Sequence, residues 1–212
     1  MYASDVEERT LTIAVSGKLW NRSLVMIDSQ TGSLWSHLLG EAMEGPLKGE
    51  ELAIIPSVIT DWQTWQRDQH ETTVMNMSRT AQRFQADFYR NPAQFVLGIA
   101  DGGPRAWPLD QLKKQPVVND EHDGAPLLIV FDAPSATAWS YDRRVGDRVL
   151  EFKMLKDGTL ADEQTDSRWN FATGQAVAGP LKGQRLRPTL AIISYAKAWE
   201  TFHPETTVWK AP

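Results

Sequence analysis

The chain has 212 residues, which is enough for one large domain or two small ones. Its hydrophobic content of 42% and its nine Trp can supply a packed core, so the composition is not that of a disordered protein. The net charge is −5 and the basic residues are scattered. Binding to phosphate backbones requires clustered Lys and Arg, so we expect no nucleic-acid partner.

No apolar run approaches the roughly 20 residues of a membrane span. Residues 1–9 lack the basic and apolar regions of a signal peptide. The sequence contains no Cys, which excludes disulfides, thiolate metal sites and thiol redox chemistry within this chain. A protein without Cys tolerates both oxidising and reducing surroundings, so this absence leaves the compartment open.

Short strands separated by turns are predicted for the first part of the chain. The strands are expected at residues 11–15, 23–27 and 50–55, with a turn at 28–31 and a further strand beginning at residue 34. A short helix should follow and end near Gln69, because Trp62 and Trp65 recur at helical spacing. Thr60 is a suitable N-cap for this helix.

Residues 75–93 are polar and weakly patterned, which predicts a packed linker; Phe84, Phe88 and Tyr89 could form one short helix there. Strands follow at residues 95–100, 105–109, 127–131, 136–141, 148–154 and 185–193. Residues 127–131 give the strongest signal of a buried strand. A second short helix is expected over residues 195–202, with Ser194 as its N-cap and Pro204 preventing its continuation.

The chain contains an internal repeat. Residues 28–74 and 162–208 align without a gap at an offset of 134, with 19 identical residues in 47 pairs. One shared motif is Asp28, Thr31, Ser33 and Trp35, which returns as Asp162, Thr165, Ser167 and Trp169. The other is the turn of Gly45, Pro46 and Gly49, which returns as Gly179, Pro180 and Gly183. Such Asp side chains accept backbone N–H groups in turns, and Gly permits positive φ, so both motifs are predicted to be structural.

Upstream of this block, Tyr2 to Leu11 aligns with Tyr141 to Leu150 at an offset of 139. The first copy then carries five extra residues, and Trp20 lies in this insertion. The first copy has no counterpart of residues 95–140, so we expect a truncated chain or one descended from a longer parent. Its sheet should then have an open edge, which favours weak self-association.

These patterns predict an α+β fold that is predominantly antiparallel β. It should contain two tandem pseudo-symmetric repeat units, each a small curled sheet with one short helix. The first unit is residues 1–74, the linker is residues 75–93, and the second unit is residues 94–212. Together they are expected to form one compact structural domain.

Three motifs of the chain carry a family resemblance. They are Asp-x-x-Thr-x-Ser-x-Trp, then Gly-Pro-Leu-x-Gly-x-x-Leu, then Trp-x-x-x-His-Pro-Glu-Thr. The combination resembles the domain-of-unknown-function 3179 family of bacteria and archaea, and it implies an exported protein, periplasmic or extracellular. Relatives often carry a Cys-Pro-Leu-Cys-type motif, and Asp132 and Ser135 occupy its two Cys positions in the second unit. The resemblance therefore implies that any thiol redox or metal chemistry of relatives is absent here.

Five side chains are the candidates for binding, and four of them, all except Glu205, are not shared between the copies. Trp20 and Trp62 are predicted to be exposed aromatics, because the repeat gives neither a Trp partner. His203 and Glu205 could contribute to a metal site, and His70 is displaced by one position from the alignment with His203. Yet four scattered His give no ligand spacing, and a His just past a helix commonly caps carbonyls, so we expect no metal and no cofactor.

No catalytic motif is present: the chain lacks Gly-x-Ser-x-Gly, a phosphate-binding Gly loop and a dinucleotide fingerprint. The sequence favours a non-catalytic binding or scaffold module of an exported protein, with an unknown ligand. The alternative is a partial or degenerate member of a thiol-redox or metal-dependent enzyme family.

Overall fold

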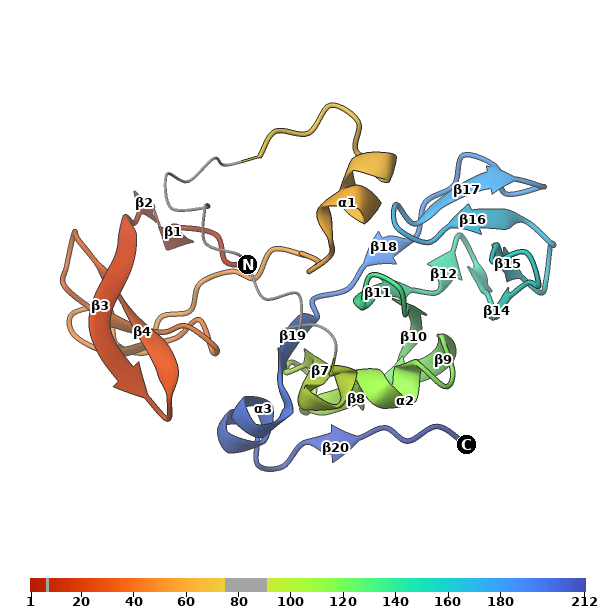
Figure 1. Ribbon diagram of the computed structural model, residues 1–212. Helices are drawn as coiled ribbons and strands as arrows, with labels where there is room; N and C mark the ends of the chain where they lie inside the picture. Colours follow the sequence, from red (N-terminus) through yellow and green to blue (C-terminus); the bar gives the residue numbers. More distant parts are fainter. Residues whose placement is uncertain (7, 75–90) are drawn as a thin grey trace.

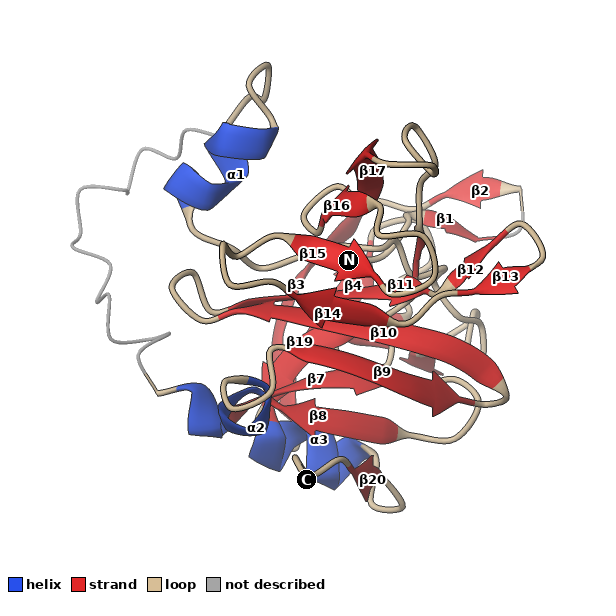
Figure 2. Ribbon diagram, turned by 90° about the vertical axis from the view of Figure 1, so that its right-hand side faces the viewer, coloured by secondary structure: helices blue, strands red, loops and turns tan. Residues whose placement is uncertain are grey.

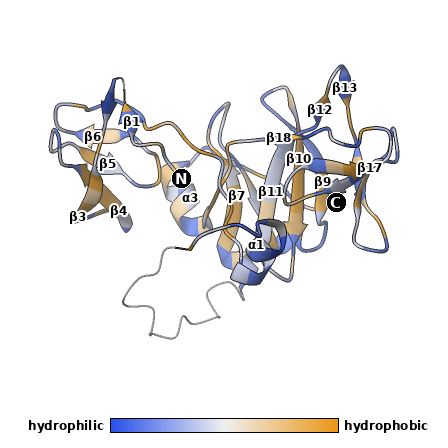
Figure 3. Cartoon of the chain, turned by 90° about the horizontal axis from the view of Figure 1, so that it is seen from above, coloured by the Kyte–Doolittle hydropathy of each residue, from blue (hydrophilic) through white to orange (hydrophobic). Residues whose placement is uncertain are grey.

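The computed structural model describes residues 1–6, 8–74 and 91–212. The fold is mostly antiparallel β, with three short helices and several small sheets. The β1–β6 strands lie at one end of the molecule and β12–β17 at the other, with two further sheets between them (Figures 1 and 3). None of the helices in these residues is long and apolar enough to cross a membrane.

The first 74 residues form a hairpin, a four-stranded meander and a helix. The hairpin is β1 (Asp5–Val6) and β2 (Arg9–Thr10). The meander is β3 (Ile13–Trp20), β4 (Ser23–Asp28), β5 (Leu34–Ser36) and β6 (Ala42–Glu44), and the helix is α1 (Trp62–Asp68). A small core around the fully buried Trp35 holds the meander together.

Residues 91–212 form more sheets than the first part of the chain does. After a 3-10 turn, η2 (Pro92–Gln94), come β7 (Phe95–Ile99), β8 (Arg105–Pro108), α2 (Leu109–Leu112), β9 (Val117–His122), β10 (Ala125–Asp132) and β11 (Thr137–Asp142). A hairpin of β12 (Arg144–Val145) and β13 (Arg148–Val149) leads to the meander β14 (Phe152–Met154), β15 (Leu160–Asp162), β16 (Arg168–Asn170) and β17 (Gln175–Ala178). The chain ends with β18 (Arg187–Pro188), β19 (Ile192–Tyr195), α3 (Ala196–Phe202) and β20 (Thr207–Val208).

The central strand β10 is buried on both faces. Leu127, Ile129 and Phe131 point into the core shared with the sheet β19-β7-β8-β20, whereas Leu128 and Val130 point toward the β14–β17 meander. A strand covered on both sides needs apolar residues at every position, which explains the continuous apolar run in the sequence. Figure 3 shows the hydrophobic colouring of β7 and β10 between the flanking sheets.

The two meanders pair in the same register. Met26 lies opposite Trp35 in the first, and Leu160 lies opposite Trp169 in the second, which is the same pair shifted by 134. In each meander the register shifts at that Trp, where it meets the next strand. The hairpins β1–β2 and β12–β13 also match, with Val6 opposite Arg9 and Val145 opposite Arg148. Elsewhere the two parts differ, because residues 1–6 and 8–74 contain no counterpart of the two central sheets.

Three of the predicted strands change partners part-way and are not continuous. Residues 148–154 divide into β13, which pairs with β12, and β14, which pairs with β15. Within residues 50–55, Glu51 bridges to Glu41 and Ile54 bridges to Tyr2. Residues 185–193 divide into β18, which pairs with β11, and β19, which pairs with β7. The prediction of single strands is wrong here because hydrophobic alternation does not show which sheet a strand joins.

The predicted N-cap of the first helix is also wrong. Asp61, and not Thr60, precedes α1, and its carboxylate accepts a hydrogen bond from Thr64 N at 2.8 Å. The side chain of Thr60 is engaged elsewhere, since its Oγ1 accepts a hydrogen bond from Thr137 Oγ1 at 2.8 Å.

In α3 the N-cap is Tyr195, with no side-chain cap bond, and Ser194 belongs to β19. Pairing of Ser194 with Val96 fixes its backbone as a strand. The helix predicted around Phe84 and Phe88 lies outside the described residues.

One buried carboxylate organises the turn between β4 and β5. Asp28 Oδ1 accepts hydrogen bonds from Thr31 N at 2.6 Å and from Thr31 Oγ1 at 2.9 Å. Its Oδ2 accepts from Ser33 N at 3.1 Å and from the indole Nε1 of Trp35 at 2.9 Å. Burial alone would raise the pKa of Asp28, but these hydrogen bonds outweigh it and hold the pKa below its ordinary value.

The second copy repeats this arrangement. Asp162 accepts from Thr165 N at 2.6 Å and from Trp169 Nε1 at 3.0 Å. The Gly-Pro-Leu-Lys-Gly turn packs against it: Gly179 has a φ of 90°, and a Cβ there would lie 2.7 Å from Ser167 Cα. Ser167 Oγ accepts a hydrogen bond from Leu181 N at 3.0 Å. The two shared motifs therefore form one connected turn structure.

We expect Asp28→Asn to lower the free energy of unfolding by about 2–4 kcal/mol. In either orientation the new amide turns a donor toward a group that already donates, Trp35 Nε1 or Thr31 N. Urea denaturation measures the loss. Asp166→Asn, the same change at an exposed position of the second turn, is the control and should stay within about 0.5 kcal/mol. Equal losses in the two variants would contradict the role of the buried carboxylate.

Candidate functional site

Three of the five candidate side chains lie around the C-terminal end of α3. The Trp20 ring meets the Phe202 ring edge-on, with centroids 4.9 Å apart. The His203 ring lies 4.1 Å from the ring of Trp199, and the backbone N–H of His203 donates to Trp199 O. Glu205 is exposed two residues further on. Trp20 thus connects the tip of the β3–β4 hairpin to α3, although 182 residues separate it from Phe202 in the sequence.

The other two candidates belong to the first helix. Trp62 lies on α1 and is 46% exposed, and His70 is exposed just beyond the helix. The cavity that Trp20 lines contains neither Trp62 nor His70 among its described wall residues. Among the described residues, no group of three or more His, Asp or Glu side chains could hold a metal ion.

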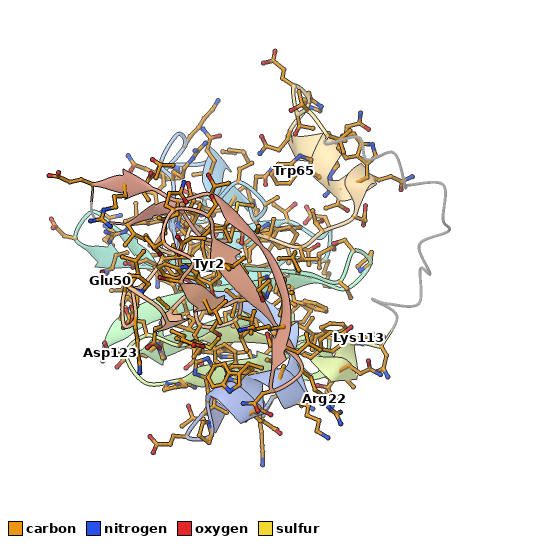
Figure 4. All side chains as sticks on the ribbon, turned by 90° about the vertical axis from the view of Figure 1, so that its left-hand side faces the viewer. Tyr2, Arg22, Glu50, Trp65, Lys113 and Asp123 are labelled. Atoms are coloured by element: carbon orange, nitrogen blue, oxygen red, sulfur yellow. The ribbon has the colours of Figure 1, made fainter. Side chains whose placement is uncertain are left out.

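A cleft of about 750 Å³ opens between the β3–β4 hairpin and the start of α3. The hairpin side contributes Arg22, Leu24 and His37, and the α3 side contributes Tyr195 and Lys197. Figure 4 places Arg22 at the hairpin tip, beside α3. The two sides of the cleft therefore come from parts of the chain that lie far apart in the sequence.

The charged groups of this cleft are all basic. Arg22, His37 and Lys197 line it, and none of the described residues in its wall is acidic. Partial loss of hydration lowers the pKa of His37, and the positive charge of the Met1 amino group lowers it further. At neutral pH the fixed positive charges are therefore Arg22 and Lys197. Both are exposed at the rim, so they attract anions in a salt-dependent way.

The walls between these charges are apolar and aromatic. Phe95 and Tyr195 stack with ring centroids 4.7 Å apart, and Leu24 and Ile193 also line the cleft. Polar groups around an apolar cavity of this size are typical of small-molecule sites, which span roughly 300–1,000 Å³.

Arg22 occupies an unfavourable backbone conformation. It and Asn21 form the two-residue turn of the hairpin, with φ of 64° and 48°. A turn with two positive φ values strongly favours Asn-Gly, and a long side chain at the second position costs free energy. Arg22 therefore weakens the hairpin locally, and the observed role of its side chain is to line the cleft.

The sequence analysis missed most of this cleft. It singled out Trp20 and its insertion, but not Arg22, His37 or Lys197. The repeat could have identified these three residues, because none of them is shared between the copies. His37 aligns with Phe171, Lys197 aligns with Gln63, and Arg22 has no aligned residue.

Asp132 and Ser135, which the resemblance aligns with two Cys of relatives, lie next to a different cavity. Ser135 Oγ donates to Asp132 Oδ2 at 2.5 Å, and it lies 2.8 Å from Thr137 Oγ1. That cavity, of about 460 Å³, is lined in part by Ser135, Phe131 and Lys113. The sequence contains no Cys, so these contacts provide no thiol chemistry.

A family model described as "Protein of unknown function (DUF3179)" matches residues 1–95 and again residues 85–212. The chain belongs to this family. The double match shows two tandem family segments, in agreement with the repeat. No curated protein and no solved structure matches the chain. The DUF3179 family brings no described activity with it, so the function must be argued from the cleft.

We expect Arg22→Gly to raise the free energy of unfolding by about 1 kcal/mol, because Gly adopts positive φ without strain. Thermal unfolding should show an increase of a few degrees. Asn21→Gly is the matched control and should change little, since Asn tolerates this conformation. Arg22→Ala keeps the Cβ and should not raise the free energy of unfolding. An increase equal to that of Arg22→Gly would contradict backbone strain at this position.

Burial lowers the pKa of His203. Its folded-state pKa is below the unfolded value of about 6.5, so its stability contribution is complete above pH 6.5 and is lost as the pH falls through the folded pKa. We expect His203→Gln to reduce the loss of unfolding free energy between pH 7.5 and pH 5. Urea denaturation at the two pH values measures it. His70→Gln, at an exposed position, should leave the loss as it is in the unaltered protein.

Proposed function

We propose that this chain is a non-catalytic binding module that holds a small organic anion between the β3–β4 hairpin and α3. The observation that carries the proposal is the charge of the cleft wall. Arg22 and Lys197 give the wall two positive charges at neutral pH, and none of the described residues that line it is acidic, in a chain whose net charge is −5. Random placement of charges in an acidic protein would favour carboxylates, so this local excess of positive charge indicates an anionic ligand.

The shape and chemistry of the walls narrow the ligand class. The basic groups are exposed, and the stacked rings of the buried Phe95 and the partly exposed Tyr195 form an apolar part of the wall. A ligand with a carboxylate at one end and a flat apolar body would place its carboxylate near the basic groups and its body against the rings. The charge would remain near water, while the body would replace water against aromatic carbon.

The same proposal gives the repeat a function. We infer that residues 1–74 and 94–212 are pseudo-symmetric units joined by residues 75–93, and that the ligand lies where the units meet. Matching meander registers and matching helices support this division. The family resemblance supports an exported, periplasmic or extracellular location.

Benzoate and benzamide form a matched pair of probes, because they share the ring and differ in the charge. We expect benzoate to bind, with shifts in the NMR signals of His37 and Tyr195, and benzamide to bind at least tenfold more weakly. Arg22→Ala and Lys197→Ala should each weaken benzoate binding several-fold, and added salt should weaken it further.

Lys156→Ala is the control for net charge, since Lys156 lies on an exposed turn outside the cleft. Its benzoate affinity should equal that of the unaltered protein. Equal binding of benzoate and benzamide, or equal losses in Lys156→Ala and Lys197→Ala, would rule out an anion site here.

A further inference from the structure

The helices α1 and α3 are copies with the same internal contacts. Trp65 Nε1 donates to Thr72 Oγ1 at 2.9 Å, and Trp199 Nε1 donates to Thr206 Oγ1 at 2.8 Å. In both helices the C-cap N–H donates to the carbonyl of that Trp. The two Trp side chains are therefore held on equivalent helix faces by equivalent bonds.

Their surroundings are different. Trp199 is 1% exposed, because it packs against Val96 and Ala106 of the β7–β8 hairpin. Its ring also covers Gly98, where a Cβ would lie only 2.5 Å from the ring. The indole fits on the hairpin because that position has no side chain.

The hairpin also completes a sheet beside α3. Strand β19, directly before the helix, pairs with β7, and Ile193 lies opposite Leu97. The β7–β8 hairpin thus contributes both a backbone edge and a surface for the indole. Figures 1 and 2 show α3 lying against β7 and β8.

The equivalent surface of the first unit is covered less: Trp65 lines two cavities together with Trp139, and no hairpin among the described residues pairs beside it. Trp65 is 37% exposed, Trp62 is 46% exposed and Ile59 is 40% exposed. Residues 58–60, which correspond to β19, have no backbone hydrogen bond to any described residue. Figures 2 and 4 show α1, with Trp65, at the margin of the molecule.

We propose that Ile59 and Trp65 form a docking surface for a β-hairpin that residues 1–74 do not themselves contain. One strand of the hairpin would pair with residues 58–60, and a Gly on that strand would lie under the Trp65 ring, as Gly98 lies under Trp199. The repeat supplies the argument for this occupant, because the same chain shows the same helix with such a hairpin in place. This surface is separate from the anion cleft; only Ile59 lines both.

The β7–β8 segment itself is the probe. A synthetic peptide of residues 92–109 is added to protein labelled with ¹⁵N in its Trp side chains, and Trp65→Phe assigns the indole signal. We expect the Trp65 signal to shift and the Trp199 signal to stay. The Gly98→Val peptide should bind at least tenfold more weakly, because its side chain meets the indole.

Two protein variants test the surface. Trp65→Ala should abolish binding of the peptide. Trp62→Ala should retain it, because α3 carries Ala196 at the corresponding position beside its own hairpin. Both variants should bind benzoate as the unaltered protein does. The proposals of a docking surface and of an anion cleft are therefore tested independently.

A fusion removes dependence on the folding of a free peptide. The Met1 amino group donates to Ser57 Oγ at 3.1 Å, so a hairpin joined to Met1 by a short flexible linker begins beside residues 58–60. We expect the fused hairpin to protect Trp65 from acrylamide quenching and a fused Gly98→Val hairpin not to protect it. An unshifted Trp65 signal with the peptide, together with equal quenching in both fusions, would overturn the proposal.

Discussion

The hydrogen bond between a buried Asp carboxylate and a buried Trp indole is the interaction on which both meanders depend. Asp28 and Trp35 are fully buried, and the carboxylate also accepts the backbone N–H groups that the turn between them leaves free. A buried charge is tolerated only when its lone pairs are occupied, so the turn, the Asp and the Trp stabilise one another. Because Ser33 and Ser167 connect this turn to the Gly-Pro-Leu-Lys-Gly segment, one cluster fixes the position of the next strand in each copy.

A strand that is buried on both faces distinguishes residues 91–212 from the described residues before position 75. In the second unit, β10 supplies a strand whose successive side chains fill two different cores. In the first unit the meander has only its own small core, and strand β3 leaves Val15 68% exposed and Leu19 71% exposed. Equal turn chemistry thus yields unequal burial, because turns are local whereas cores need additional layers. The exposed α1 face and the exposed β3 edge have this one cause.

Local signals in the sequence predicted the turns, the repeat and most strands. The run at 127–131 and the Asp-to-Trp spacing work because they reflect neighbours within a few residues. The two predicted helix N-caps are wrong because residues distant in the sequence determine their structure. Ser194 is a strand residue because it pairs with Val96, and Thr60 forms a hydrogen bond with Thr137 instead of capping α1. The cleft was beyond reach for the same reason, since its two sides come from parts of the chain that only the tertiary fold brings together.

Duplication explains where a binding site could arise without loss of stability. A residue that serves the shared turn cannot change without exposing a buried donor or acceptor, as the Asp28–Trp35 pair shows. Positions that make no contact within the shared turn are free to differ between the copies. The basic groups of the cleft occupy such positions: Arg22 lies in the insertion, His37 aligns with Phe171, and Lys197 aligns with Gln63. Arg22 is the sharpest case, because its backbone conformation favours Gly on stability grounds alone. The proposed anion site gives a reason for a residue that disfavours its own turn yet lines a basic cleft, whereas folding alone gives none.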